Sequence, residues 1–191
     1  MKPSRLLASL VLAGFGSAAV AHPGHESAGF FSGFGHPFGG LDHLLAMLAV
    51  GWYAARQHGA ARWALPSGFV AAMLVGAGVG AAGLALPMVE SGIAVSVLAL
   101  GLAIAFAAQL RIAAALPLVA GFALFHGYAH HTEIGDAAFA TYASGFAIAT
   151  AILHGTGFIV GRCLPETPVA AGLRRAAGGA IAVAGAALIG G

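Results

Sequence analysis

The sequence contains very little charge. Only 7% of its 191 residues are Asp, Glu, Lys or Arg, whereas about 25% is usual for a soluble domain. The hydrophobic fraction is 60% and the mean hydropathy is +0.93. A formal net charge of only +2 gives no sign of a nucleic-acid partner. These values exclude an ordinary soluble domain and indicate an integral membrane protein, with the lipid bilayer as its main partner.

Cysteine and nucleotide-binding motifs are nearly absent as well. Cys163 is the single cysteine, which excludes a disulfide or a thiolate metal cluster within one chain. The chain contains no G-x-x-x-x-G-K-[ST] motif, which excludes ATP hydrolysis by that route. We therefore expect a non-enzymatic protein with no permanently bound cofactor.

The first 21 residues have the pattern of a secretory signal peptide. Lys2 and Arg5 are followed by an apolar stretch over residues 6–15 and by Ala19-Val20-Ala21, which fits an A-x-A cleavage site. We expect cleavage there, which leaves residues 22–191 as a single transmembrane domain that begins outside the cytoplasm. The alternative is an uncleaved first helix.

Six apolar stretches follow, each close to the roughly 20 residues that span a bilayer. The predicted fold is all-α: a polytopic membrane protein with six transmembrane helices after a cleaved signal peptide. Thirty glycines indicate closely packed helices. The Gly76 and Gly80 pair serves packing within the chain or between chains, so a homo-oligomer stays open. The expected spans are 37–55, 65–87, 91–110, 112–131, 137–160 and 173–190.

Charges in the links between these spans predict an orientation. The links after the second and fourth spans carry no Lys or Arg, only Glu90, Glu133 and Asp136. The positive-inside rule then puts the other links in the cytoplasm and both mature termini outside. Those other links carry Arg56, Arg62, Arg111, Arg162, Arg174 and Arg175.

The first of two histidine clusters runs from His36 to His43. Pro37 suits the first turn of a helix, and spacing of seven residues puts His36 and His43 on one helical face. Asp42 either binds a metal directly or orients an imidazole by accepting its second N–H.

The second cluster contains His126, His130 and Glu133, which fall within an arc of about 60° on a helix. The four-residue spacing of the two histidines suits binding of one ion. Glu133 is about 10 Å along the axis from His126, so it shares that ion only if the helix end unwinds. His131 points elsewhere.

The predicted orientation puts both clusters on the outer side of the membrane. Glu90 joins them there, whereas His154 is isolated nearer the cytoplasm and has either a packing role or an ion-relay role. His22 and His25 belong to the N-terminal tail. Imidazole and carboxylate suit first-row divalent ions. The candidate metal ligands are His36, Asp42, His43, Glu90, His126, His130 and Glu133.

Both clusters resemble the two signatures of the HupE/UreJ family of nickel/cobalt permeases. His36-Pro37-x-x-Gly40-x-Asp42-His43 is similar to the first, and the segment from Phe125 to Glu133 is similar to the second, FHGxAHGxE. His131 stands where that pattern usually has Gly. The resemblance covers essentially the whole chain and is strongest to the hydrogenase-associated members.

The resemblance implies import of Ni²⁺ across the bacterial inner membrane, for hydrogenase or urease maturation, with both mature termini periplasmic. Co²⁺ is the alternative substrate, because Co²⁺ and Ni²⁺ are adjacent in the order of affinities of first-row divalent metals for a given site. Two other functions remain open: a b-type haem protein with His126 and His154 as axial ligands, and an intramembrane hydrolase using Ser144 and His154.

Overall fold

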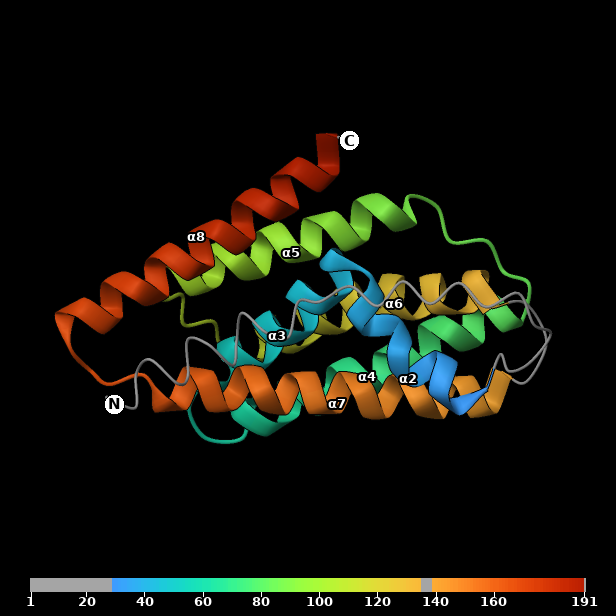
Figure 1. The fold of residues 1–191 in the computed structure, drawn as a ribbon, viewed down its shortest axis with the longest axis horizontal. Helices are drawn as coiled ribbons and strands as arrows, with labels where there is room; N and C mark the ends of the chain where they lie inside the picture. Colours follow the sequence, from blue (N-terminus) through green and yellow to red (C-terminus); the bar gives the residue numbers. More distant parts are fainter. Residues whose placement is uncertain (1–28, 135–138, 191) are drawn as a thin grey trace, which may run out of the picture.

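The structure is a computed structural model that describes residues 29–134 and 139–190. The predicted signal peptide, His22, His25 and Asp136 lie outside these residues. All secondary structure in the described parts is helical (Figure 1). The helices are α2 (Phe30–Gly39), α3 (Leu41–Ala55), α4 (Ala61–Ala81), α5 (Val89–Ala105), α6 (Ile112–Ile134), α7 (Phe139–Cys163) and α8 (Pro168–Gly190).

Four of these helices are long and apolar enough to cross a membrane, namely α4, α6, α7 and α8. The apolar helices α3 and α5 are shorter, with 15 and 17 residues, or about 22 and 25 Å at 1.5 Å per residue. The prediction of an all-α membrane protein is confirmed. The count of six transmembrane helices stays a prediction, because two of the six apolar helices are short and α2 is an additional short helix.

The chain bends between α2 and α3, where a helix beginning at Pro37 was expected. Pro37 instead lies inside α2, near its end. Gly40 then takes extended φ and ψ angles of −105° and 127°, and α3 begins at Leu41. Two consecutive glycines weaken a helix by about 1 kcal/mol each relative to alanine, which favours a break at this place. The expected helix start was therefore wrong.

The link between α5 and α6 is also longer than the single Arg111 expected from the sequence. α5 ends at Ala105 because Ala107 adopts a positive φ of 52°. The Ala108 N–H then donates to the Ala103 carbonyl at 2.8 Å, which closes the helix end in the manner of a Schellman motif. Residues 106–111 form the link.

Glycines let the helix backbones come into direct contact. Gly76 of α4 lies against the Leu124 carbonyl of α6, and Gly127 of α6 lies against the Met73 carbonyl of α4. Gly51 does the same between α3 and α7. Small residues allow this close approach where there is no hydrophobic drive between helices. Gly76 therefore serves packing within the chain.

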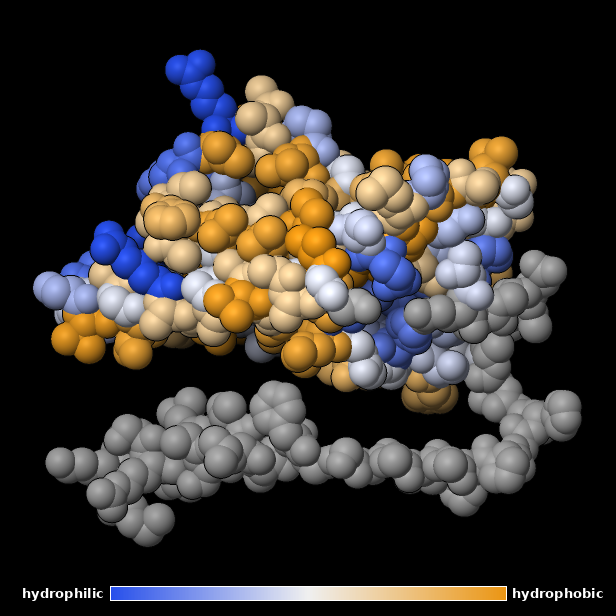
Figure 2. Space-filling view, turned by 90° about the horizontal axis from the view of Figure 1, so that it is seen from above, coloured by the Kyte–Doolittle hydropathy of each residue, from blue (hydrophilic) through white to orange (hydrophobic). Residues whose placement is uncertain are grey.

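The bundle has two chemically different ends. The helix directions bring the ends of α3 and α7 and the starts of α4, α6 and α8 together at one end, on the left in Figure 1. The opposite end holds α2, the start of α3 and the end of α6. Figure 2 shows hydrophilic residues gathered toward the ends and mostly hydrophobic residues over the middle. The first end, named here the arginine end, carries Arg56, Arg62, Arg111, Arg162, Arg174 and Arg175.

Candidate metal site

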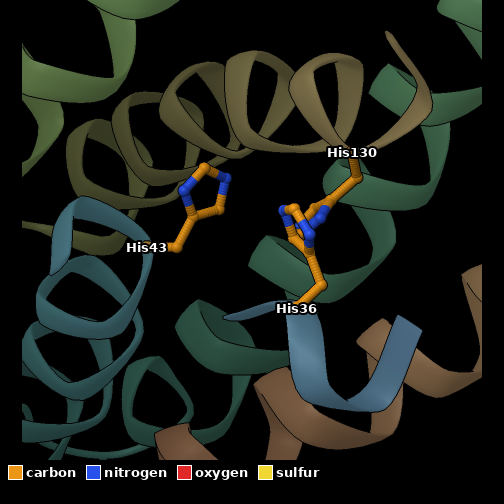
Figure 3. A group of neighbouring side chains, drawn as sticks. All are labelled: His36, His43 and His130. Carbon is orange, nitrogen blue, oxygen red and sulfur yellow. The ribbon is translucent and has the colours of Figure 1, made fainter. Parts of the chain in front are cut away.

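Three imidazoles converge at the end opposite the arginines. His36 comes from α2, His43 from α3 and His130 from α6 (Figure 3). One nitrogen from each lies within 4.8 Å of the others. Two nitrogens that bind one ion at about 2.1 Å are at most about 4.2 Å apart. A small inward movement of these side chains therefore suffices for all three to bind one ion.

A fourth imidazole extends this group toward the middle of the bundle. His126 lies one turn before His130 on α6, and its ring centroid is 4.8 Å from that of His43. Its Nε2 is 2.9 Å from the Ser96 hydroxyl, and that hydroxyl donates its hydrogen to the Ile93 carbonyl at 2.6 Å. A hydroxyl has one hydrogen to donate, so His126 must donate from Nε2. Its buried Nδ1 has no hydrogen-bond partner and is left with a free lone pair.

Asp42 fixes the orientation of His43. Its Oδ1 lies 3.1 Å from His43 Nδ1 and accepts the His43 main-chain N–H at 2.7 Å. A carboxylate that accepts the second N–H of a metal-binding imidazole sets its tautomer and raises its basicity. His43 Nε2 is buried without a hydrogen-bond partner. Of the two roles expected for Asp42, the geometry therefore favours the orienting one.

Aromatic side chains form the wall behind the imidazoles. His130 stacks on Phe146 of α7, with ring centroids 4.3 Å apart and planes at 6°. The ring centroid of Tyr142, one turn earlier, lies 6.0 Å from that of His36 and 6.4 Å from that of His130. Neither nitrogen of His130 has a hydrogen-bond partner. A buried polar group without a partner costs free energy, and a bound cation would recover that cost. We name His36, His43, His126 and His130 the histidine group.

Of the two predicted glutamates, Glu90 stands apart from this group. Glu90 is exposed in the first turn of α5 and is not among the residues that converge. Glu133 belongs to α6, but its side chain lies outside the described residues. Because α6 continues to Ile134, the helix does not unwind before Glu133, as sharing an ion with His126 would require.

Two expectations about helix faces had different outcomes. His36 and His43 do come together, with ring centroids 5.8 Å apart, but the bend at Gly40 brings them together rather than one helical face. His131 points away from the group, as predicted: it packs against Gly80 of α4 and lies 5.5 Å from Phe139.

The sequence reasoning missed the groups that support the ligands. Ser96, Tyr142 and Phe146 are fully buried and contact the imidazoles. Ser96 carried a weak signal, as a polar residue in a strongly apolar stretch. The two aromatic residues carried none, since aromatic side chains in such a stretch are usually core residues.

Comparison with known proteins agrees with this arrangement. The HupE / UreJ protein family matches residues 10–188 of the chain. The chain belongs to the HupE/UreJ family. This is a family of nickel/cobalt transporters associated with hydrogenase and urease. A HupE/UreJ relative, Protein HupE of Rhizobium leguminosarum bv. viciae, is 44% identical over 192 residues and covers 99% of both chains. No solved structure matches the chain.

Proposed function

We propose that this protein imports Ni²⁺ across the bacterial inner membrane and supplies the metal for hydrogenase or urease maturation. The observation that carries the proposal is the convergence of four imidazoles at one end of a charge-poor helical bundle. Imidazole is a favourable ligand for Ni²⁺ among the first-row ions. Co²⁺ is the second candidate substrate, since the same donors bind it with neighbouring affinity.

The distribution of charge supports an inward direction. The arginine end is expected in the cytoplasm by the positive-inside rule, so the histidine group faces the periplasm. Asp42 and Glu90 lie at that periplasmic end. Among the described residues, all the arginines lie at the opposite end. The carboxylates of Asp42 and Glu90 attract a cation to this end, and none of the described arginines lies there to oppose them.

The four imidazoles replace part of the water shell of the arriving ion. Glu90, exposed at the same end, meets the hydrated ion first, and Glu133 is proposed as a further ligand. Asp42 holds His43 with Nε2 directed to the ion. Binding has to stay weak enough for release. An inside-negative potential supplies about 4.6 kcal/mol per 100 mV for a divalent ion, enough for accumulation without ATP.

A haem function with His126 and His154 as axial ligands fits the geometry poorly. The Phe69 ring packs against both imidazoles, with its centroid 5.6 Å from that of His126 and 5.1 Å from that of His154. His126 Nε2 is also held by Ser96. A haem held by both imidazoles would have to be accommodated beside this fully buried phenyl ring.

The hydrolase alternative also lacks support. Ser144 is exposed on α7, and its hydroxyl donates to the Thr141 carbonyl at 2.7 Å. His154 lies ten residues further along the same helix and is buried. At 1.5 Å per residue the two are about 15 Å apart along the axis, which is too far for a nucleophile and its base.

Uptake of radiolabelled Ni²⁺ at nanomolar concentration tests the proposal. Cells that lack other nickel importers and express the chain should accumulate the ion above cells carrying an empty vector. Excess unlabelled Co²⁺ then ranks the two substrates. Accumulation equal to the vector control, with the protein present in the membrane, would rule out nickel import.

A further inference from the structure

The buried polar groups of the bundle continue beyond the histidine group. Four residues at steps of four along α7 are fully buried, and the first two contact the histidine group. Residues four apart stack on one face of a helix. The row is Tyr142, Phe146, Thr150 and His154.

His154 ends this row with both ring nitrogens unsatisfied. Its side chain is only 3% exposed, and neither Nδ1 nor Nε2 makes a hydrogen bond. The Pro66 carbonyl of α4 interacts with the ring without completing one. The Pro66 carbonyl can serve one ring nitrogen at most, so at least one nitrogen is left buried without a partner, at a cost of about 1–3 kcal/mol that packing alone does not recover.

His154 lies at a depth in the bundle where a transported ion would need a second binding site. It lies eight residues beyond Phe146, the ring on which His130 stacks, and therefore about 12 Å deeper along α7. The hydrocarbon core is about 30 Å thick, and a bare ion in such a medium costs tens of kcal/mol. An ion that leaves the histidine group thus needs a ligand near this depth.

The surroundings of His154 contain a soft donor and free space. Thr150 lies in the row between the two sites, and its hydroxyl donates to the sulfur of Met73 on α4 at 3.7 Å. A groove of about 620 Å³ between α4 and α7, lined mostly by apolar residues, reaches His154.

We propose that His154 is an inner metal-binding site, which takes the divalent ion from the histidine group and passes it toward the arginine end. The Phe69 ring contacts both His154 and His126, with centroids 5.1 and 5.6 Å from theirs. The inference rests on the proposed transport function and adds a second binding step to it. His154 would act with Thr150 and Met73, which supply oxygen and thioether donors.

Initial rates of Ni²⁺ uptake over a range of concentrations test the inner site. His154→Leu should lower the maximal rate at least about tenfold and leave the half-saturating concentration within about threefold, because the outer site is intact. The exposed His58 provides the matched control, and His58→Gln should behave like the wild type. A wild-type maximal rate in His154→Leu would overturn the inner site while leaving nickel import in place, whereas absent wild-type uptake would overturn nickel import itself.

A cysteine at the same position keeps the test decisive if the leucine variant does not fold. In a Cys163→Ser background, His154→Cys places a thiolate ligand on the path, and thiolates favour soft ions. Inhibition of Ni²⁺ uptake by Cd²⁺ should then strengthen about tenfold relative to the same background with His154. A structural role would not change the preference between ions, so unchanged Cd²⁺ inhibition with preserved nickel uptake would refute the proposal.

Discussion

An exposed ion pair at the arginine end contrasts with the buried imidazoles at the other end. At the arginine end, Glu166 is bound by Arg56 at 2.6 Å and lies 3.6 Å from Arg174, and its side chain is 70% exposed. At the other end, His43, His126 and His130 are buried with ring nitrogens that lack partners.

This difference separates stabilising from functional polar groups. Exposed ion pairs contribute little to stability, about 0–1 kcal/mol, and they serve orientation in the membrane. Buried imidazoles without partners destabilise the empty protein, and a bound cation would recover that cost. The comparison therefore favours the histidine end as the place of the proposed metal binding.

The largest effect is expected at the centre of the histidine group. His43 contacts His36, His126 and His130, so His43→Ala should reduce high-affinity Ni²⁺ uptake at least about 100-fold. Radiolabel uptake, normalised to the amount of protein in the membrane, checks this. His58→Ala at the arginine end is the control. Normal uptake by His43→Ala would show that transport does not require the histidine group.

A tenfold effect is expected one step away from the ligands. Ser96 holds the tautomer of His126, and loss of such a supporting partner costs about 10- to 100-fold in metal affinity. Ser96→Ala should therefore raise the half-saturating Ni²⁺ concentration by about tenfold. Ser91→Ala, earlier on α5, is the control. Equal affinities in the two variants would show that the Ser96 contact does not matter for binding.

Packing between α4 and α6 should show an effect on stability. A methyl group at Gly127 would collide with the Met73 carbonyl, whereas Gly121 on the same helix has no atom within 4 Å of an added Cβ. Overpacking costs about 1–3 kcal/mol, so Gly127→Ala should unfold at a lower temperature in detergent. Gly121→Ala should match or exceed the wild type. If both variants unfold alike, the helices are not held by this backbone contact.

The smallest effect is expected at the arginine end. The hydrogen bond from Arg56 holds the pKa of Glu166 below its usual value. A lowered folded-state pKa stabilises the protein above about pH 4.5, the ordinary value of a glutamate, and this contribution is lost as the pH falls below it. Glu166→Gln should remove this small pH dependence and leave uptake unchanged. Thermal unfolding between about pH 3 and 6 measures it, and a strong loss of uptake would show that the arginine end has more than an orienting role.

The sequence predicted that the protein is an all-α membrane protein. It also predicted six candidate site residues that the structure places at the histidine end, namely His36, Asp42, His43, Glu90, His126 and His130. Low charge and apolar runs determine the class, because each helix satisfies its own backbone in lipid. The helix boundaries were less predictable, since the bend at Gly40 and the end of α5 at Ala105 depend on local backbone angles.

The residues of the candidate site were predictable from the sequence, but their assembly was not. His126 and His130 share a face because α6 is continuous, and this follows from spacing alone. The approach of His36 to His130, with ring centroids 4.7 Å apart, depends on the packing of α2 against α7. The Ser96 contact likewise joins α5 to α6, and no pattern within one helix encodes such a contact.

X-ray absorption at the nickel edge of the purified, Ni²⁺-loaded protein tests the central claim most directly. Imidazole ligands give a characteristic multiple-scattering pattern, and the histidine group predicts about three to four of them on one ion. The His36→Ala/His43→Ala double variant should lose about half of that pattern, and His58→Ala should keep all of it. A nickel ion surrounded by oxygen donors without imidazole, or a spectrum unchanged in the double variant, would contradict the account.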